Sequence, residues 1–173
     1  IKCGEGEVFV AGGVESMSRA PYAIPKNPDG SMSHLTAWDT TLGWRFPNPK
    51  LKEQYGTESM GETAENLRLV GPTITREEQD RFALESQRKA VAAIESGRFA
   101  EEIVPVPVGR KGEQIKTDDH LRPDTTMEGL AKLKPAFAKD GFVTAGNASG
   151  IVDGAAMVTV TTAANAQAKG SKP

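Results

Sequence analysis

Apolar and polar positions repeat most regularly in the middle of the chain, where they predict a long helix. Over residues 76–96, apolar positions recur about every 3.6 residues and charged residues fall on the opposite side. Thr75 and Glu78 form a capping-box pattern at its start, and Gly97 follows its end. The helix is therefore expected to be amphipathic. Its expected apolar face consists of Phe82, Ala83, Ser86, Ala90, Ala93 and Ile94.

Three further apolar segments predict strands. Residues 7–11 are followed by a glycine pair, which predicts a buried strand that turns at the glycines. The apolar residues that follow the small-residue segment ending at Gly150 predict a second strand. In residues 103–108 prolines alternate with β-branched residues, and because proline lacks an N–H group this predicts an edge strand, with residues 114–117 returning beside it.

The remaining segments predict shorter helices and a long irregular stretch. Residues 61–69 predict a short helix ended by Gly71 and Pro72, and residues 126–133 predict another. Residues 21–55 contain five prolines and few periodic positions, so we expect irregular structure. A stretch of this length in a compact domain is more often functional or interfacial than idle.

Composition argues against a nucleic-acid-binding protein, a membrane-spanning protein and a disulfide-stabilised protein. The chain has 173 residues and a formal net charge of −2, and its basic residues are interleaved with acidic ones, so no basic field for nucleic acid is expected. No apolar run reaches the roughly 20 residues needed to cross a bilayer. A single cysteine excludes an internal disulfide and suits a reducing compartment, so we expect a cytoplasmic protein. Because the first residue is Ile and a helix pattern begins near the end, we also expect a piece of a longer protein; the alternative is a processed mature domain.

Candidate chemistry in the residues themselves is sparse. Cys3, which precedes a glycine, could be a nucleophile or a small buried side chain; we interpret it as buried, because free cysteine is among the most buried residue types. Asp118, Asp119 and His120 are adjacent, so on an extended chain they point to opposite faces, and no metal site is expected. No glycine-rich phosphate motif occurs.

One segment has almost no side-chain bulk. Residues 145–150 read AGNASG. Small residues allow a ligand or another backbone to come close. The residues alone leave two interpretations equally open: a ligand surface, or a tight strand junction in the core.

Several ordered segments carry a family resemblance. They are AGGVESMSRAPY, MGETAEN, TREEQDRFALESQRKA, GRFAEEIVPV, LAKLKPAF and TAGNASG with DGAAM. Together they resemble the thiolase family of acyl-CoA acyltransferases over essentially the whole chain. The segments TTLGWRFPNPKLKEQYGTESMGETAEN and RPDTTMEGLAKLKP are most similar to the branch that acts on β-ketoadipyl-CoA (3-oxoadipyl-CoA).

The resemblance implies a partial thiolase fold of the α/β class. Residues 1–21 would end the N-terminal βαβαβ half, residues 22–150 would form the CoA-binding loop domain, and residues 151–173 would return to the N-terminal half. It also implies that the chain is a central fragment without catalytic residues, inactive alone. The family's nucleophilic cysteine would lie before residue 1, and its histidine and second cysteine after residue 173. Cys3 does not match the nucleophile.

The implied reaction is the cleavage of 3-oxoadipyl-CoA by CoA to succinyl-CoA and acetyl-CoA. A cysteine thiolate attacks the 3-keto carbon, a second cysteine handles the proton, and polar donors hold the oxyanions. Coenzyme A is then a co-substrate, and no permanently bound cofactor is implied. Three alternatives stay open: an acetyl-CoA acetyltransferase, a general 3-ketoacyl-CoA thiolase, and a non-catalytic thiolase-like protein that binds CoA.

The resemblance carries seven residues to a CoA-binding surface. They are Leu51, Met60, Arg122, Phe137, Ala145, Ala148 and Ser149. For Arg122 the alternative is a solvated surface arginine, and for Phe137 and Leu51 it is plain core packing. Arg45 is a candidate for the distal carboxylate of the acyl group. A homodimer or homotetramer is implied for the full-length protein.

Overall fold

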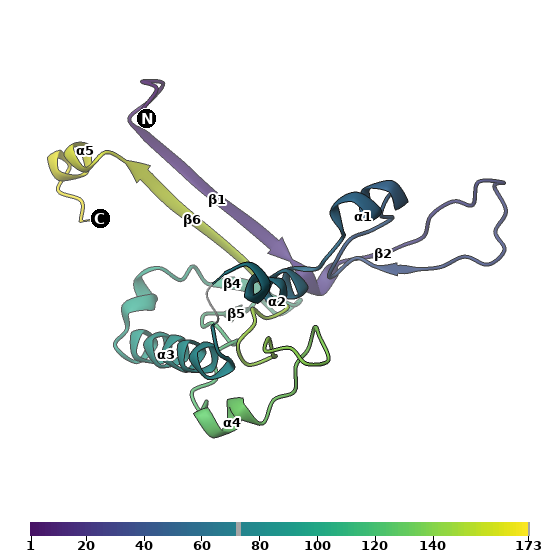
Figure 1. The fold of residues 1–173 in the computed structure, drawn as a ribbon. Coiled ribbons are helices and arrows are strands. Elements are labelled where there is room, and N and C mark those ends of the chain that lie inside the picture. The colour runs from purple at the N-terminus through teal and green to yellow at the C-terminus, as the bar shows by residue number, and fades with distance from the viewer. Residues whose placement is uncertain (72–73, 173) are drawn as a thin grey trace.

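The computed structural model describes residues 1–71 and 74–172. In this part, strands form three two-stranded antiparallel sheets, β1–β6, β2–β3 and β4–β5. Figure 1 shows the β1–β6 ribbon extending away from a body built around α2, α3 and α4, while the segment with β2 extends on another side of that body. The N-terminus and α5 lie at the far end of the ribbon.

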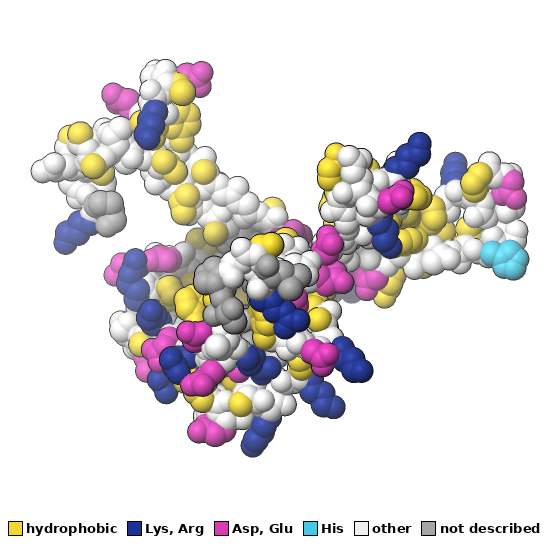
Figure 2. Space-filling view, viewed as in Figure 1, with side chains coloured by type: hydrophobic (Ala, Val, Ile, Leu, Met, Phe, Trp, Pro, Cys, Tyr) yellow, Lys and Arg dark blue, Asp and Glu magenta, His cyan; other side chains and the backbone are white. Residues whose placement is uncertain are grey.

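The ribbon pairs β1 (Val8–Ser16) with β6 (Asp153–Thr161) in full register, so that Val8 faces Thr161 and Ser16 faces Asp153. All residues of β1 are exposed, and so are all of β6 except the half-buried Thr161. Figure 2 shows apolar side chains along the ribbon, whereas charged side chains crowd the body. Apolar side chains on both sides of an exposed ribbon are typical of a sheet that needs further elements to cover it.

The expected turn after residue 11 is wrong, because β1 continues straight through the glycine pair. A Cβ atom added to Gly12 would stand 2.3 Å from the carbonyl oxygen of Ala156 and 2.1 Å from the sulfur of Met157. The glycine therefore permits close approach of the two strands and does not turn the chain. At the base of the ribbon, the carboxylate of Asp153 accepts hydrogen bonds from the backbone N–H and the hydroxyl of Ser18.

The body is held by a small core between three helices. These are α2 (Met60–Val70), α3 (Arg76–Glu95) and α4 (Met127–Ala131). The expected capping box of α3 is confirmed: the Thr75 hydroxyl accepts from the Glu78 N–H, and the Glu78 carboxylate accepts from the Thr75 N–H. A second capping box, not predicted, joins Ser59 and Glu62 at the start of α2. Among the described residues, the buried apolar side chains of the body are Leu84, Leu130 and Val143, and a further one, Ala166, lies on α5 at the far end of the ribbon.

The expected apolar face of α3 is partly wrong. Phe82 is 80% exposed and Ser86 is exposed, whereas Asp80 and Leu84 are buried. The inward side of the helix is thus centred on Asp80 and Leu84. The reason is a polar contact: the Asp80 carboxylate accepts a hydrogen bond from Asn147, and Arg76 of the same helix, which binds the other oxygen of Asp80, donates to the carbonyls of Leu130 and Leu133, so this side of α3 is held toward the body.

Short elements complete the fold. The stretch expected to be irregular contains β2, β3 and also the unpredicted α1, which begins where the Asn48 side chain caps the helix and Pro49 takes its first position. The expected edge strand is confirmed only over three residues, paired with β5 across a turn at residues 109–112. Pro72 lies outside the described residues. The remaining bounds are η1 (Met17–Arg19), β2 (Tyr22–Ala23), β3 (Trp38–Asp39), α1 (Pro49–Tyr55), η2 (Arg98–Glu101), β4 (Val106–Val108), β5 (Glu113–Ile115) and α5 (Ala163–Ala168).

The expectation that Cys3 is buried is also wrong. Its side chain is exposed. It lies in a turn closed by a hydrogen bond from the Gly4 N–H to the carbonyl of Ile1, beyond the free end of β1 where nothing in the described chain covers it. Across the described residues, no helix combines the length and apolarity that a membrane span requires.

Candidate functional site

The segment of small residues forms a tight turn over a buried anchor. The carbonyl of Thr144 accepts from the N–H groups of Asn147 and Ala148 at 3.3 and 3.0 Å, and its hydroxyl accepts from the Gly146 N–H at 3.2 Å. Thr144 itself is fully buried. Ala145 and Ser149 are exposed and Ala148 is half-buried. The turn therefore offers backbone and small side chains at the surface while its base is fixed.

Glu65 of α2 holds the chain just before this turn. Its carboxylate accepts from the N–H of Phe142 at 3.0 and 3.1 Å and from the N–H of Val143 at 2.9 Å. Glu65 is buried, and a Cβ atom at Gly141 would stand 2.2 Å from its Oε1 atom. Glycine at position 141 therefore lets the carboxylate reach the backbone directly.

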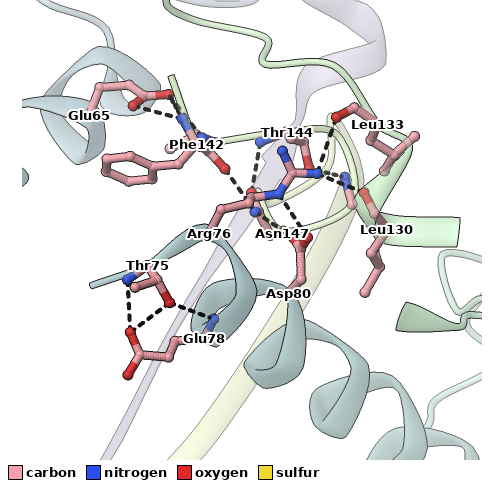
Figure 3. Close-up of polar contacts among 12 residues, drawn as sticks. Glu65, Thr75, Arg76, Glu78, Asp80, Leu130, Leu133, Phe142, Thr144 and Asn147 are labelled. Carbon is pink, nitrogen blue, oxygen red and sulfur yellow. Dashed lines mark hydrogen bonds and ion pairs between the residues drawn. The ribbon is translucent and has the colours of Figure 1, made fainter. Parts of the chain in front are cut away.

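Asp80 of α3 holds the turn from the other side (Figure 3). Its Oδ1 atom accepts from Asn147 Nδ2 at 2.9 Å, and its Oδ2 atom accepts from Arg76 Nε at 2.7 Å. The guanidinium of Arg76 also donates to the carbonyls of Leu130 and Leu133, at 2.6 and 3.1 Å. Two buried carboxylates from two helices thus converge on one short segment.

Apolar contacts fill the space beneath the turn. A Cβ atom at Gly146 would stand 2.5 Å from methyl groups of Leu130 and Leu133, so the turn lies directly on these side chains. The segment between α4 and the turn doubles back along it: Pro135 bridges to Thr144, and the Ala136 N–H donates to the carbonyl of Val143 at 2.9 Å. Position 146 therefore tolerates only glycine without movement.

The structure brings several of the residues predicted for CoA binding into one region. Phe137 follows the bridge that pairs with the turn, and its ring lies on Gly61, next to Met60. Met60 is 85% exposed and Phe137 is half-buried. Met60 thus directly precedes the glycine that the Phe137 ring covers, and Phe137 follows the bridge to the turn by two residues.

Arg122 joins this region through the segment that precedes it. A Cβ atom at Gly150 would stand 2.2 Å from the ring of His120, so this segment lies against the end of the turn. The Arg122 N–H donates to Gln87 Oε1 of α3 at 3.0 Å. The Arg122 residue also lines a shallow cavity of about 150 Å³. The other residues lining that cavity are Leu84, Gln87, Arg88, Val91, Ala92, Glu95, Pro123 and Thr125.

Leu51 and Arg45 lie apart from these contacts. Leu51 is 51% exposed on α1, a helix without a buried residue. Arg45 donates from Nη2 to the carbonyl of Thr40 at 2.5 Å. The ring of Phe46, next to Arg45, packs edge-on against Trp38, with ring centroids 5.8 Å apart. Neither residue shares a described hydrogen bond with the turn.

Sequence reasoning missed the residues that fix the turn. Glu65, Asp80 and Asn147 were not singled out for this role. The available signal was Asp80: it lies four residues before the apolar Leu84, on the side of α3 that faces the body, and a carboxylate in such a place needs a partner.

This arrangement suits binding more than proton transfer. Both buried carboxylates are occupied by donors from the chain itself, and the exposed part of the turn is neutral. The pKa of Glu62, near this region, lies below its ordinary value because its carboxylate is hydrogen-bonded to the backbone N–H and then to the hydroxyl of Ser59, which caps α2. Within the described residues, no cluster of three or more metal-ligating side chains occurs.

Comparisons with known proteins place the chain among relatives. The family model described as thiolase, N-terminal domain, matches residues 1–164. The β-ketoadipyl-CoA thiolase of Pseudomonas putida is 51% identical over 175 residues, covering 100% of this chain and 44% of that protein. The acetyl-CoA acetyltransferase of Pseudomonas aeruginosa is 51% identical over 174 residues, covering 98% of this chain and 43% of that protein.

Solved structures agree with these matches. Human mitochondrial 3-ketoacyl-CoA thiolase in complex with CoA is 40% identical with a TM-score of 0.72, over 96% of this chain and 40% of that one. The acetyl-CoA acetyltransferase of Bacillus anthracis is 45% identical with a TM-score of 0.74, over 98% of this chain and 42% of that one. The α/β fold class is thereby confirmed, and the chain spans less than half the length of the relatives it matches.

Proposed function

Because the chain belongs to the thiolase family, we propose that the protein encoded by its complete gene cleaves 3-oxoadipyl-CoA with CoA to succinyl-CoA and acetyl-CoA. The observation that carries this proposal is the identity of 51% and 49% to β-ketoadipyl-CoA thiolases of Pseudomonas putida and Escherichia coli, over the whole chain. Coenzyme A is a co-substrate in this proposal, as the presence of CoA in a related solved structure supports.

Residues 22–150 supply the CoA-binding part of this proposed enzyme, and the β1–β6 ribbon belongs to the sheet of its N-terminal half. The exposed apolar side chains of Val10, Val14 and Met157 support the second statement, since a sheet with such faces is stable only when covered. Relatives more than twice as long contain the additional chain that could cover it.

The CoA-binding role falls on the region around the small-residue turn. Pantetheine is thin, so exposed backbone and small side chains at Ala145, Ala148 and Ser149 allow it to approach closely. Phe137 and Met60 supply apolar contact, and Leu51 adds a further apolar side chain from α1. Arg122, on the segment that passes the end of the turn, supplies a cation for the phosphates of CoA.

The proposed reaction requires catalytic cysteines and a histidine, and no residue of this chain matches those positions of the family. The bond between C2 and C3 of the acyl group breaks, the acyl part forms a thioester with a cysteine, and the C2 carbon leaves as acetyl-CoA after gaining a proton; CoA thiol then takes the acyl group. We expect the 173 residues alone to be inactive, because no residue of this chain matches the family's catalytic positions.

The test is thiolysis by the protein expressed from its complete gene. Consumption of 3-oxoadipyl-CoA with equal formation of succinyl-CoA and acetyl-CoA supports the proposal. The absence of both products from folded protein contradicts it and favours a non-catalytic CoA-binding protein.

The 51% identity to an acetyl-CoA acetyltransferase supports a second candidate function. This candidate and the first differ in the acyl group, which carries a distal carboxylate in 3-oxoadipyl-CoA and none in acetoacetyl-CoA. The ratio of kcat/KM for the two substrates decides between them: a preference for acetoacetyl-CoA favours the second candidate.

A further inference from the structure

Asp80 is a buried charge that the proposed reaction does not use. It is 2% exposed, on the inward side of α3. A carboxylate in such a place is costly unless its oxygens are hydrogen-bonded. Both oxygens are bonded: Oδ2 accepts from Arg76 of the same helix at 2.7 Å, and Oδ1 accepts from Asn147 of the turn at 2.9 Å.

The bond to Asn147 fixes the orientation of that amide. The Nδ2 group of Asn147 has two N–H donors, and the second donates to the carbonyl of Phe142 at 3.0 Å. The Oδ1 atom accepts from the Thr144 N–H at 2.7 Å. The amide therefore closes the loop from residue 142 to residue 147. A reversed amide would place its oxygen against the Asp80 carboxylate, so Asp80 selects the orientation that closes the loop.

The bond to Arg76 fixes the support beneath the same loop. Arg76 Nη2 donates to the carbonyls of Leu130 and Leu133 at the end of α4. The methyl groups of these leucines lie against Gly146 in the middle of the turn. Asp80 thus acts on the turn twice, through Asn147 from the side and through Arg76 and the leucines from below.

From this geometry we propose that Asp80 is a positioning residue for CoA binding, one that acts through Asn147 and Arg76 and does not touch the ligand. The proposal rests on the function proposed above for the turn. Ala145 and Ser149, which are exposed and meet the ligand, have the shape that CoA requires because Asp80 holds the turn closed. Loss of this link weakens CoA binding and leaves the chemical step nearly unchanged.

The test compares Asp80→Asn with the matched control Glu77→Gln in the protein from the complete gene. Both changes replace a carboxylate of α3 by its amide, but Glu77 is exposed and forms an ion pair with the exposed Arg81. The new amide at position 80 turns one N–H group toward a donor, so at least one bond is lost. A lost hydrogen bond to a charged group predicts a Kd for CoA raised roughly tenfold by calorimetry. The kcat at saturating CoA and the control should stay within twofold of the parent.

A double-mutant cycle separates positioning from general loosening of the fold. Asn147→Ser removes one of the two groups through which Asp80 acts, so adding Asp80→Asn to it should raise the Kd by less than in the parent. The binding stoichiometry in the titration counts the molecules that are irreversibly unfolded. A reversibly unfolded fraction raises the apparent Kd in inverse proportion to the folded fraction, so the folded fraction of each variant is measured by chemical denaturation and the Kd is corrected for it. If Asp80→Asn yields no folded protein, Asn147→Ser alone takes its place, with the same expected rise.

The outcomes are distinct. An unchanged Kd in Asp80→Asn or Asn147→Ser, or full additivity in the double variant, overturns the positioning role while thiolysis by the parent leaves the proposed function intact. A fall in kcat as large as the rise in Kd also overturns it. A folded parent that neither binds CoA nor performs thiolysis overturns the proposed function and, with it, this inference.

Discussion

The ring of Phe137 lies directly on the backbone of Gly61 at the start of α2. A Cβ atom at position 61 would stand 2.4 Å from two of the ring carbons. This contact joins the beginning of α2 to the segment that pairs with the small-residue turn, and it places a predicted CoA contact beside Met60. The helix accepts a glycine here because the ring occupies the space of a side chain.

Gly61→Ala is expected to destabilise the protein although alanine is the better helix former. Alanine gains about 1 kcal/mol of helix propensity over glycine. Forcing a methyl group into a filled space costs about 1–3 kcal/mol, because the ring must move. The thermal unfolding midpoint should therefore fall. The double variant Gly61→Ala, Phe137→Leu should recover part of the loss; a rise in the midpoint of the single variant contradicts the contact.

Glu65→Gln is expected to destabilise the segment before the turn. The carboxylate accepts from two backbone N–H groups, whereas an amide presents one oxygen and turns an N–H group toward a donor. An unsatisfied buried donor costs about 1–3 kcal/mol. Chemical denaturation measures the change. The control is Glu85→Gln, which removes an exposed ion pair to Arg88 and should change stability by less than about 1 kcal/mol; equal effects contradict the role of Glu65.

Glu78 is expected to make the stability of α3 depend on pH. The pKa of Glu78 lies below its ordinary value of 4.5, first because the Thr75 N–H donates to the carboxylate and then because the Thr75 hydroxyl does. A pKa lowered by folding means that the group stabilises the fold above pH 4.5 and that this contribution is lost as the pH falls through the folded-state value. In Glu78→Gln this part of the acid dependence should be missing. Parallel melting curves of parent and variant between neutral and acidic pH contradict it.

Arg45→Ala is expected to change acyl specificity if Arg45 meets the distal carboxylate. One N–H of its guanidinium is bound to the carbonyl of Thr40, which orients the group. Loss of a charged hydrogen bond predicts a fall of roughly tenfold or more in kcat/KM for 3-oxoadipyl-CoA and little change for acetoacetyl-CoA. Arg110→Ala, in an exposed turn, is the control and should affect neither substrate. Equal losses on both substrates contradict a specificity role for Arg45.

The sequence predicted those elements whose signals are local. The capping box at Thr75 and Glu78, the glycine after α3 and the return strand β6 depend on residues near one another in the chain. The failures depend on distant partners. Gly12 is a turn signal by itself, but opposite Ala156 it allows two strands to come close. Phe82 is apolar, but the polar partners of Asp80 turn the other side of α3 inward.

The candidate site also has a part that local sequence signals predicted and a part that depends on distant partners. The small side chains of residues 145–150 could be recognised from the sequence, and the family resemblance implied that this segment binds CoA. What holds the segment was not visible, because Glu65 and Asp80 lie 78 and 67 residues from the groups they bind. Such pairings have no period or spacing that a single sequence reveals. The signal they leave is a charged residue on a side of a helix that faces the core.

Amide hydrogen exchange of the complete protein with and without CoA tests the central claim most directly, namely that the turn held by Glu65 and Asp80 is the CoA-binding surface. The account predicts slower exchange with CoA in residues 144–150 and in the segment around Arg122, and unchanged exchange around Asp29, in the connection between β2 and β3. Unchanged exchange in residues 144–150 at saturating CoA, in protein that performs thiolysis, would contradict it.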